Sequence, residues 1–151
     1  AWRPYAIPQI LERYGIPEEV YVYYPFRADP GGLSAYHLFL YYPDLGIEID
    51  YLGKATLLDD RAGWAEACPN ILETDDINLF LFQPAMVPNY RERTLPVSSL
   101  PLPELPEGTD PYDVVSWVES TQSSLAAFEQ LFTEAEEGTV CFEFKTYWTD
   151  N

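Results

Sequence analysis

The stretch that decides the fold is AYHLFLYYPDLGIEIDY, residues 35–51. Residues 35–42 are almost continuously apolar, which predicts a central strand with covered or half-covered faces, and PDLG at 43–46 predicts a hairpin connection. Residues 47–51 alternate between apolar and acidic side chains, as a strand with one solvated face does. We therefore expect an antiparallel hairpin whose second strand turns Ile47, Ile49 and Tyr51 to a core and Glu48 and Asp50 to water.

The segment before this hairpin predicts a helix and one more strand. Residues 7–15 (IPQILERYG) place apolar side chains at helical spacing, with Pro8 suited to the first turn and Gly15 to the C-terminal cap. Pro17 prevents the helix from continuing, and residues 20–24 (VYVYY) have a strand composition. A helix followed by an antiparallel meander is typical of an α+β domain.

The middle of the chain is less regular and leads into a proline-rich segment. Residues 63–67 predict a helical turn, and residues 77–82 (INLFLF) predict a strand that ends before Pro84. Residues 84–110 hold many of the 14 prolines and predict an extended strap with its leucines packed on the domain. The alternative is a peptide that docks in the aromatic groove of a partner.

The C-terminal part predicts two helices and a final strand. Asp110 and Pro111 have the order of an N-cap and a first helical residue, and a serine-rich break precedes the second helix. Residues 139–148 predict the last strand, with Val140, Phe142 and Phe144 on one face.

The whole chain is expected to be one α+β domain. It would contain a short N-terminal helix, an antiparallel sheet of about four to five strands, the proline-rich strap, two C-terminal helices and the final strand. Its parts would be residues 7–83 (helix plus meander sheet), 84–110 (strap) and 111–151 (helices plus last strand), within a single domain of residues 1–151. Two smaller subdomains are the alternative, because the connection is long for a compact domain.

The two cysteines, Cys68 and Cys141, lie far apart in the sequence. Neither belongs to a C-x-x-C pair, and His37 is the only histidine that could join them, so a zinc site lacks ligands. They either form a disulfide that ties the last strand to the middle of the chain or are buried thiols of a cytosolic protein. We predict the disulfide, in an extracytoplasmic protein.

The helix, the Gly15-Ile16-Pro17 turn and the three strands that follow make up a unit over residues 7–52. This unit resembles the SmpA/OmlA small-lipoprotein family and the wider β-lactamase-inhibitor-like folds. The resemblance implies an extracytoplasmic, often lipid-anchored protein without enzymatic activity that binds other proteins. The lipidated N-terminal cysteine of that family has no counterpart here, so an anchor would need a segment ahead of Ala1.

The composition excludes several classes of protein. The chain has 151 residues with 8 Lys+Arg and 25 Asp+Glu, so its net charge is 8 − 25 = −17. With 47% hydrophobic and 16% aromatic residues it is not disordered. Phosphate binding needs cationic side chains, so we expect neither nucleic acid nor an anionic membrane surface as a partner. Since the apolar runs are shorter than the ~18 residues of a membrane span, we expect no insertion of this chain into a membrane.

Catalysis and metal binding have little support in the sequence. It contains no nucleophile elbow, P-loop, dinucleotide-binding or zinc-protease motif, and His37 within an apolar strand is typical of a structural histidine. We therefore predict that the protein is not an enzyme and has no cofactor. The adjacent acidic pairs in loop-like segments would suit a hard cation such as calcium, which binds six to eight oxygen ligands. The candidate ligands are Asp59, Asp60, Asp75 and Asp76.

Tyrosines crowd the predicted first sheet, and consecutive pairs must point to opposite faces. Tyrosine is favoured at protein interfaces, so we predict a partner surface. Its members would be Tyr21, Tyr23, Tyr24, Tyr41 and Tyr42. We thus expect a non-catalytic, extracytoplasmic protein-binding or assembly-accessory domain whose partner is a protein with a basic or polar surface. The alternatives are an acidic inhibitor, immunity-type protein or nucleic-acid mimic acting on a basic partner, and a small carboxylate-dependent hydrolase.

Overall fold

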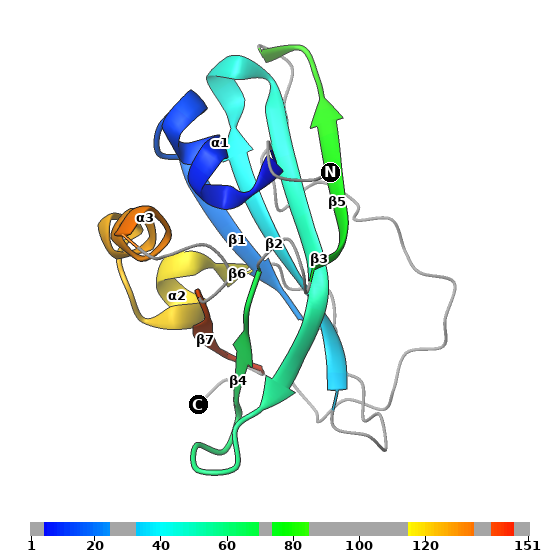
Figure 1. Ribbon diagram of the computed structural model, residues 1–151, viewed down its shortest axis with the longest axis vertical. Helices are drawn as coiled ribbons and strands as arrows, with labels where there is room; N and C mark the ends of the chain where they lie inside the picture. The colour runs from blue at the N-terminus through cyan, green and yellow to red at the C-terminus, as the bar shows by residue number, and fades with distance from the viewer. Residues whose placement is uncertain (1–4, 25–32, 70–73, 85–114, 135–139, 147–151) are drawn as a thin grey trace.

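The predicted hairpin forms the centre of the structure. A computed structural model describes residues 5–24, 33–69, 74–84, 115–134 and 140–146, without the side chains of residues 33, 34, 74 and 75. Strands β2 (Leu33–Tyr42) and β3 (Ile47–Leu57) pair antiparallel along their length, from Tyr42↔Ile47 to Leu33↔Thr56 (Figure 1). A 3₁₀ turn, η2 (Pro43–Leu45), joins them.

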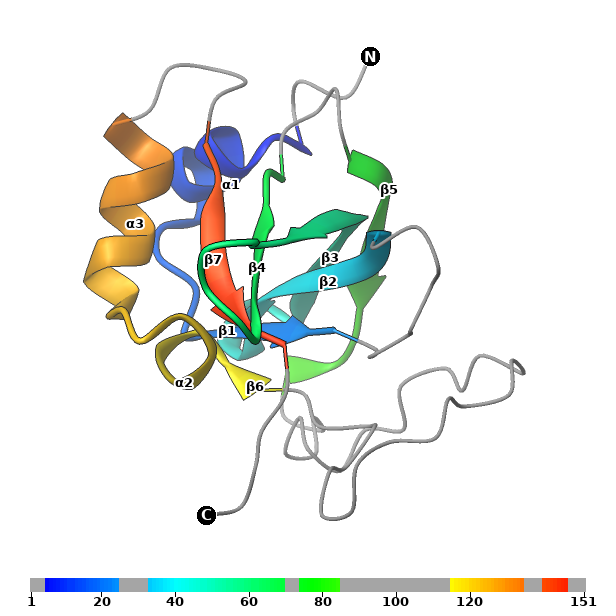
Figure 2. The ribbon, with the colours of Figure 1, turned by 90° about the horizontal axis from the view of Figure 1, so that it is seen from below.

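Further strands extend this hairpin into one antiparallel sheet that curls into a half-barrel (Figure 2). The strands lie in the order β6-β1-β2-β3-β4-β7. Strand β5 is outside this path and pairs with a different part of β3 from the part that pairs with β4. Within the described residues the sheet has seven strands including the final one, one or two more than the predicted four to five plus the final strand. The added strands are β1 (Glu19–Tyr23), β4 (Trp64–Ala67), β5 (Thr74–Leu81), β6 (Val115–Ser116) and β7 (Phe142–Lys145).

Two of these strands replace predicted helix. Residues 64–67 form β4, because they pair with β3 on one side and with β7 on the other, and these pairings override the local helical preference of an alanine-rich segment. Val115 pairs with Val22 at the edge of β1, so the first C-terminal helix begins only at Trp117. Val118 on this helix is 51% exposed.

The other sequence predictions have mixed outcomes. The final strand covers only Phe142–Lys145 among the described residues, and Val140, Phe142 and Phe144 are buried as expected. The strap lies outside the described residues except for residue 84, as does the predicted helix start at residues 110 and 111.

In the part of the chain that the structure describes, three α-helices lie on one side of the sheet and cover its core face (Figures 1 and 2). They are α1 (Ile7–Tyr14), α2 (Trp117–Thr121) and α3 (Leu125–Glu134). An aromatic chain holds α2 and α3 to β7: the ring centroid of Trp117 lies 5.0 Å from that of Phe128 and 4.9 Å from that of Phe142. Such pairs stabilise a core by about 1 kcal/mol beyond the burial of their area.

Two tyrosines of the sheet attach α1 at both of its ends. Tyr51 donates a hydrogen bond to the carbonyl of Tyr5, just before the helix, at 2.6 Å. Tyr42 donates one to the carbonyl of Gly15, just after the helix, at 2.9 Å. Burial raises the pKa of both hydroxyls, with smaller contributions from Tyr14 beside Tyr42 and from Tyr42 beside Tyr51. The helix is therefore fixed by polar contacts as well as by Ile7, Ile10 and Leu11 in the core.

The prediction that Glu48 and Asp50 are exposed to solvent is wrong. Their side chains point away from the helices, as the alternation predicted, but they are only 3% and 4% exposed. Because β3 lies between β2 and β5, aromatic and polar neighbours flank both carboxylates on the second face of the sheet.

The turn between β2 and β3 provides a test of the hairpin. Gly46 has φ 63°, and a Cβ at this position would collide with the carbonyl oxygen of Phe82. We expect Gly46→Ala to lower the free energy of unfolding by more than about 2 kcal/mol, from the left-handed backbone and from this collision. Urea denaturation measures the change.

Two further variants separate the two causes. Gly46→Asn keeps the collision but tolerates the left-handed backbone, so we expect it to be nearly as destabilising as Gly46→Ala. Asp44→Ala in the same turn should change the stability by no more than about 0.5 kcal/mol, because Asp44 is exposed. A Gly46→Asn protein as stable as the wild type would contradict the assigned close approach.

The buried tyrosines predict a loss of stability at alkaline pH. Their pKa values are raised in the folded state, whereas in the unfolded chain they ionise near pH ~10. Their contribution is therefore fully present below about pH 10 and is lost as the pH rises towards the folded-state pKa. We expect the free energy of unfolding to fall above about pH 10, by up to ~1.4 kcal/mol per pH unit for each tyrosine.

The Tyr51→Phe variant isolates one of these contributions. At neutral pH its free energy of unfolding should be about 1 kcal/mol lower than that of the wild type, because the hydrogen bond to the carbonyl of Tyr5 is missing. Above about pH 10 its stability should fall less steeply than that of the wild type, in parallel urea titrations. Equal slopes would show that Tyr51 has no part in the alkaline transition.

Candidate binding surface

The predicted tyrosine surface is largely interior. Tyr21, Tyr41 and Tyr42 are buried, so the exposure expected of them is wrong, and Tyr23 and Tyr24 are half-buried. Tyr42 and Tyr24 pack on the core under the helices. The other three lie on the second face, so these five residues do not form one continuous surface.

The second face of the sheet is a mixed layer of aromatic and acidic side chains. Cross-strand neighbours share a face, and the register places Tyr21, Phe39 and Asp50 in one row across β1, β2 and β3. The hydroxyl of Tyr21 donates to Glu19 at 2.7 Å. The ring of Tyr41 stacks on Phe82 at a centroid distance of 5.7 Å.

His37 and Asp50 form an ion-pair geometry within this layer. The Nδ1 atom of His37 lies 3.0 and 3.1 Å from the two carboxylate oxygens of Asp50. The imidazole ring also stacks on Phe39 at 5.6 Å, nearly parallel to it. A carboxylate at Nδ1 fixes the orientation of a histidine, as it does in catalytic triads, but the same contacts serve a structural histidine equally well.

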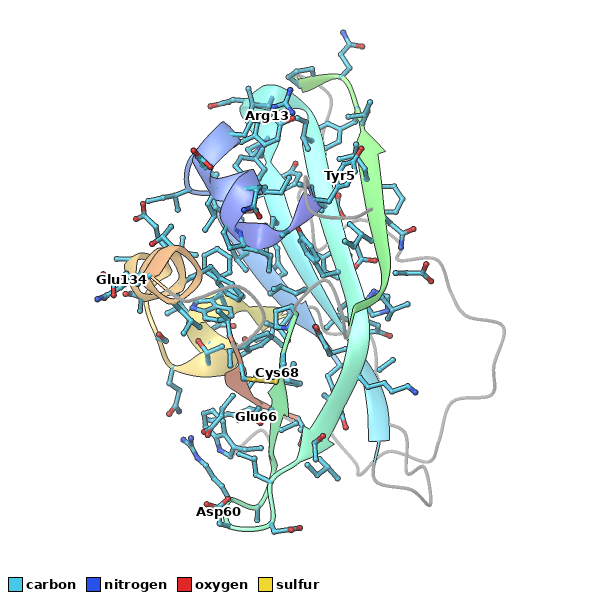
Figure 3. All side chains as sticks on the ribbon, in the orientation of Figure 1. Tyr5, Arg13, Asp60, Glu66, Cys68 and Glu134 are labelled. Carbon is cyan, nitrogen blue, oxygen red and sulfur yellow. A yellow bond between two sulfur atoms is a disulfide. The ribbon has the colours of Figure 1, made fainter. Side chains whose placement is uncertain are left out.

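The acidic pairs proposed for calcium lie on different parts of the fold. Asp59 and Asp60 are exposed in the turn after β3, and Figure 3 places Asp60 at the tip of that turn, away from β5. Asp76 is exposed on β5 opposite Leu52, and the side chain of Asp75 lies outside the described residues. From Leu52 to the turn, β3 extends by roughly 3.3 Å per residue over several residues. The described carboxylates of the two pairs therefore do not converge.

The disulfide between Cys68 and Cys141 is confirmed (Figure 3). Ala67 of β4 pairs with Phe142 of β7, so the two cysteines occupy the next position of the same antiparallel register. The bond therefore closes the end of this ladder and joins segments 73 residues apart in the sequence. Glu66 lies close to both sulfur atoms, but sulfur binds metals as a thiolate and both cysteines are oxidised here.

Strand β5 carries apolar side chains that the sequence did not single out as a site. Leu79, Phe80 and Leu81 are 49%, 45% and 74% exposed, and we call these three residues the β5 patch. One edge of β5 pairs with β3, and no described strand pairs with its other edge (Figure 1). The apolar run at 77–82 predicted a strand, but only the pairing order reveals that it lies at an edge.

The backbone of β5 also presents unpaired groups at that outer edge. The N–H of Phe82 donates to the carbonyl of Gly46 at 2.9 Å, which identifies Gly46↔Phe82 as a hydrogen-bonded pair. Such pairs alternate along antiparallel strands, so the N–H and C=O groups of Ile77, Leu79 and Leu81 point away from β3. Among the described residues none of these groups has a hydrogen-bond partner from another strand. An exposed apolar strand with such an edge is a template for pairing with another chain.

Comparisons with models of known protein families, with curated proteins and with solved structures found no match in any of the three. The resemblance of residues 7–52 to the small-lipoprotein family therefore stays a prediction. In the part of the chain that the structure describes, no helix has the length and hydropathy that crossing a membrane requires.

Removal of the disulfide tests how much the fold depends on it. On the chain-entropy model, the loop that it closes corresponds to about 4 kcal/mol of stabilisation. In guanidinium denaturation, the free energy of unfolding of the double variant Cys68→Ala/Cys141→Ala should be lower than that of the wild type by about this amount. Dithiothreitol should lower the free energy of unfolding of the wild type by a similar amount. The control is dithiothreitol on the double variant, which should have no effect. A loss below about 1 kcal/mol would show that β4 and β7 stay paired without the bond.

Proposed function

We propose that this chain is a non-catalytic, extracytoplasmic protein-binding domain that docks a cationic partner protein on the β5 patch. The observation that carries the proposal is the exposure of three consecutive apolar residues, Leu79, Phe80 and Leu81, on an edge strand. Scattered single apolar side chains are common on protein surfaces, whereas consecutive ones along an unpaired strand edge favour association. The disulfide is consistent with an oxidising compartment.

The charge of the chain limits the partner. At −17, two copies repel each other, so a cationic protein is a better occupant of the β5 patch than a second copy of this chain. Asp76 is exposed on β5 itself and adds a local negative charge. Opposite charges would speed the encounter, and the exposed apolar side chains would supply buried area.

An inhibitor or nucleic-acid mimic would need acidic side chains gathered on one face. The exposed acids of the described residues instead come from all parts of the fold. They lie on α1, η2, the β3–β4 turn, β5, α2, α3 and β7, for example Glu12, Asp44, Asp60, Asp76, Glu119, Glu134 and Glu143. This distribution favours a local apolar docking site over a mimic of a phosphate backbone.

Site-specific photocrosslinking in the native host tests the proposal. The full chain would carry p-benzoylphenylalanine in place of Phe80 or, as the control, in place of Val118, which is similarly exposed but lies on α2. We expect a discrete crosslinked adduct from position 80 only, and we expect the protein crosslinked to this chain to be cationic. Mass spectrometry of the adduct identifies the crosslinked segment.

Two outcomes would contradict the proposal. One is the absence of any adduct at position 80 in cells that contain the folded protein. The other is the same set of adducts from positions 80 and 118, which would show contact without a docking site. Acid quenching followed by thiol alkylation of the same cells tests the compartment, because a protein in an oxidising compartment keeps Cys68 and Cys141 blocked.

A further inference from the structure

We infer that the partner binds by adding a strand to the outer edge of β5, through an extended segment in which apolar and cationic residues alternate. This inference rests on the proposed function and specifies its binding mode and the chemistry of the recognised segment. Its basis is the combination of two features of β5: which backbone groups point outward, and which side chains lie on each face.

The outward groups define the hydrogen bonds of the added strand. Ile77, Leu79 and Leu81 direct their N–H and C=O groups away from β3, as the Gly46↔Phe82 hydrogen bond requires. An antiparallel strand would place a residue directly opposite each of the three and exchange both backbone hydrogen bonds with it. Strand addition of this kind takes its affinity from the main chain and its specificity from alternate side chains.

The two faces of β5 define the side chains of the added strand. Leu79 pairs with Ile49 and Leu81 with Ile47, so both leucines lie on the face that carries the core and the helices. Directly paired residues share a face, so residues added opposite these leucines would be apolar.

The other face of β5 carries Asp76, Asn78 and Phe80, next to the buried carboxylates of Asp50 and Glu48 on β3. The intervening residues of an added strand would point to this acidic and aromatic side. Lysine or arginine fits there, by charge attraction to Asp76 and by contact with the ring of Phe80. The pattern that matches both faces is therefore a strict alternation of apolar and cationic residues.

Defined peptides test this binding mode on the purified full chain with its disulfide intact. The probe is an end-blocked eight-residue peptide of alternating valine and lysine, and its affinity is measured by fluorescence anisotropy at physiological ionic strength. In a peptide that is N-methylated on its valines, the backbone N–H groups that would donate to β5 are replaced by N-methyl groups. The control peptide is N-methylated on its lysines, so it carries the same number of methyl groups on amides that face away from β5. We expect the first modification to weaken binding at least about tenfold and the second by less than about threefold.

Two more comparisons separate strand addition from general charge attraction. A peptide with the same residues in two blocks, four valines and then four lysines, should bind at least about tenfold more weakly than the alternating one. On the protein side, Leu79→Lys/Leu81→Lys should weaken binding of the alternating peptide by a similar factor, with Val118→Lys as the control variant within about twofold of the wild type. Circular dichroism confirms that each variant is folded, and the peptide modifications need no change in the protein.

The inference is overturned if the two N-methylated peptides bind equally, if the block peptide binds as well as the alternating one, or if no alternating peptide binds. In each case, a crosslink confined to position 80 would still support a protein-binding site at β5, so failure of the binding mode and failure of the proposed function are distinguishable.

Discussion

The rest of the structure depends on the backbone pairing of β2 with β3. This ladder runs from Tyr42↔Ile47 at the Gly46 turn to Leu33↔Thr56, and a shift by one residue would turn the core-facing side chains of one strand to the opposite face from those of the other. In the observed register Leu38, Leu40 and Ile49 face the helices. The Gly46 turn, where no side chain has room beside Phe82, holds this register at its closed end.

The length of β3 decides what happens at its second edge. β5 occupies this edge from Ile47 to Gly53, and β4 pairs with it from Ala55 to Leu57, after a register shift near Gly53. The sheet then continues through β4 to β7, where the disulfide closes the ladder, while β5 is left as a separate edge. Because two strands share one edge of β3, the sheet continues through β4 while β5 remains an edge strand that carries the exposed β5 patch.

Charge and packing act at different places in this molecule. The exposed acids of the described residues occur on several helices, turns and strands, whereas Tyr42, expected on the surface, and Tyr51, expected in the core, supply hydroxyls that hold α1 in place. Among the exposed large apolar side chains of the described residues, three consecutive ones lie on β5, as leucine and phenylalanine. The negative charge therefore selects the kind of partner, and β5 offers the place where contact area and unpaired backbone occur together.

Local patterns in the sequence determined much of the fold: α1 with its Gly15 end, the β2–β3 hairpin and the strand at 77–82. These follow from short-range rules on glycine, proline and periodicity. The sequence favoured a Cys68–Cys141 disulfide over two free thiols, and the structure contains this disulfide. Only the tertiary structure decided that residues 64–67 are a strand, that Glu48 and Asp50 are buried, and that Leu79 and Leu81 lie at an edge. Alternation along a strand states which side chains share a face. It does not state which strands become neighbours, and burial and edge exposure depend on those neighbours.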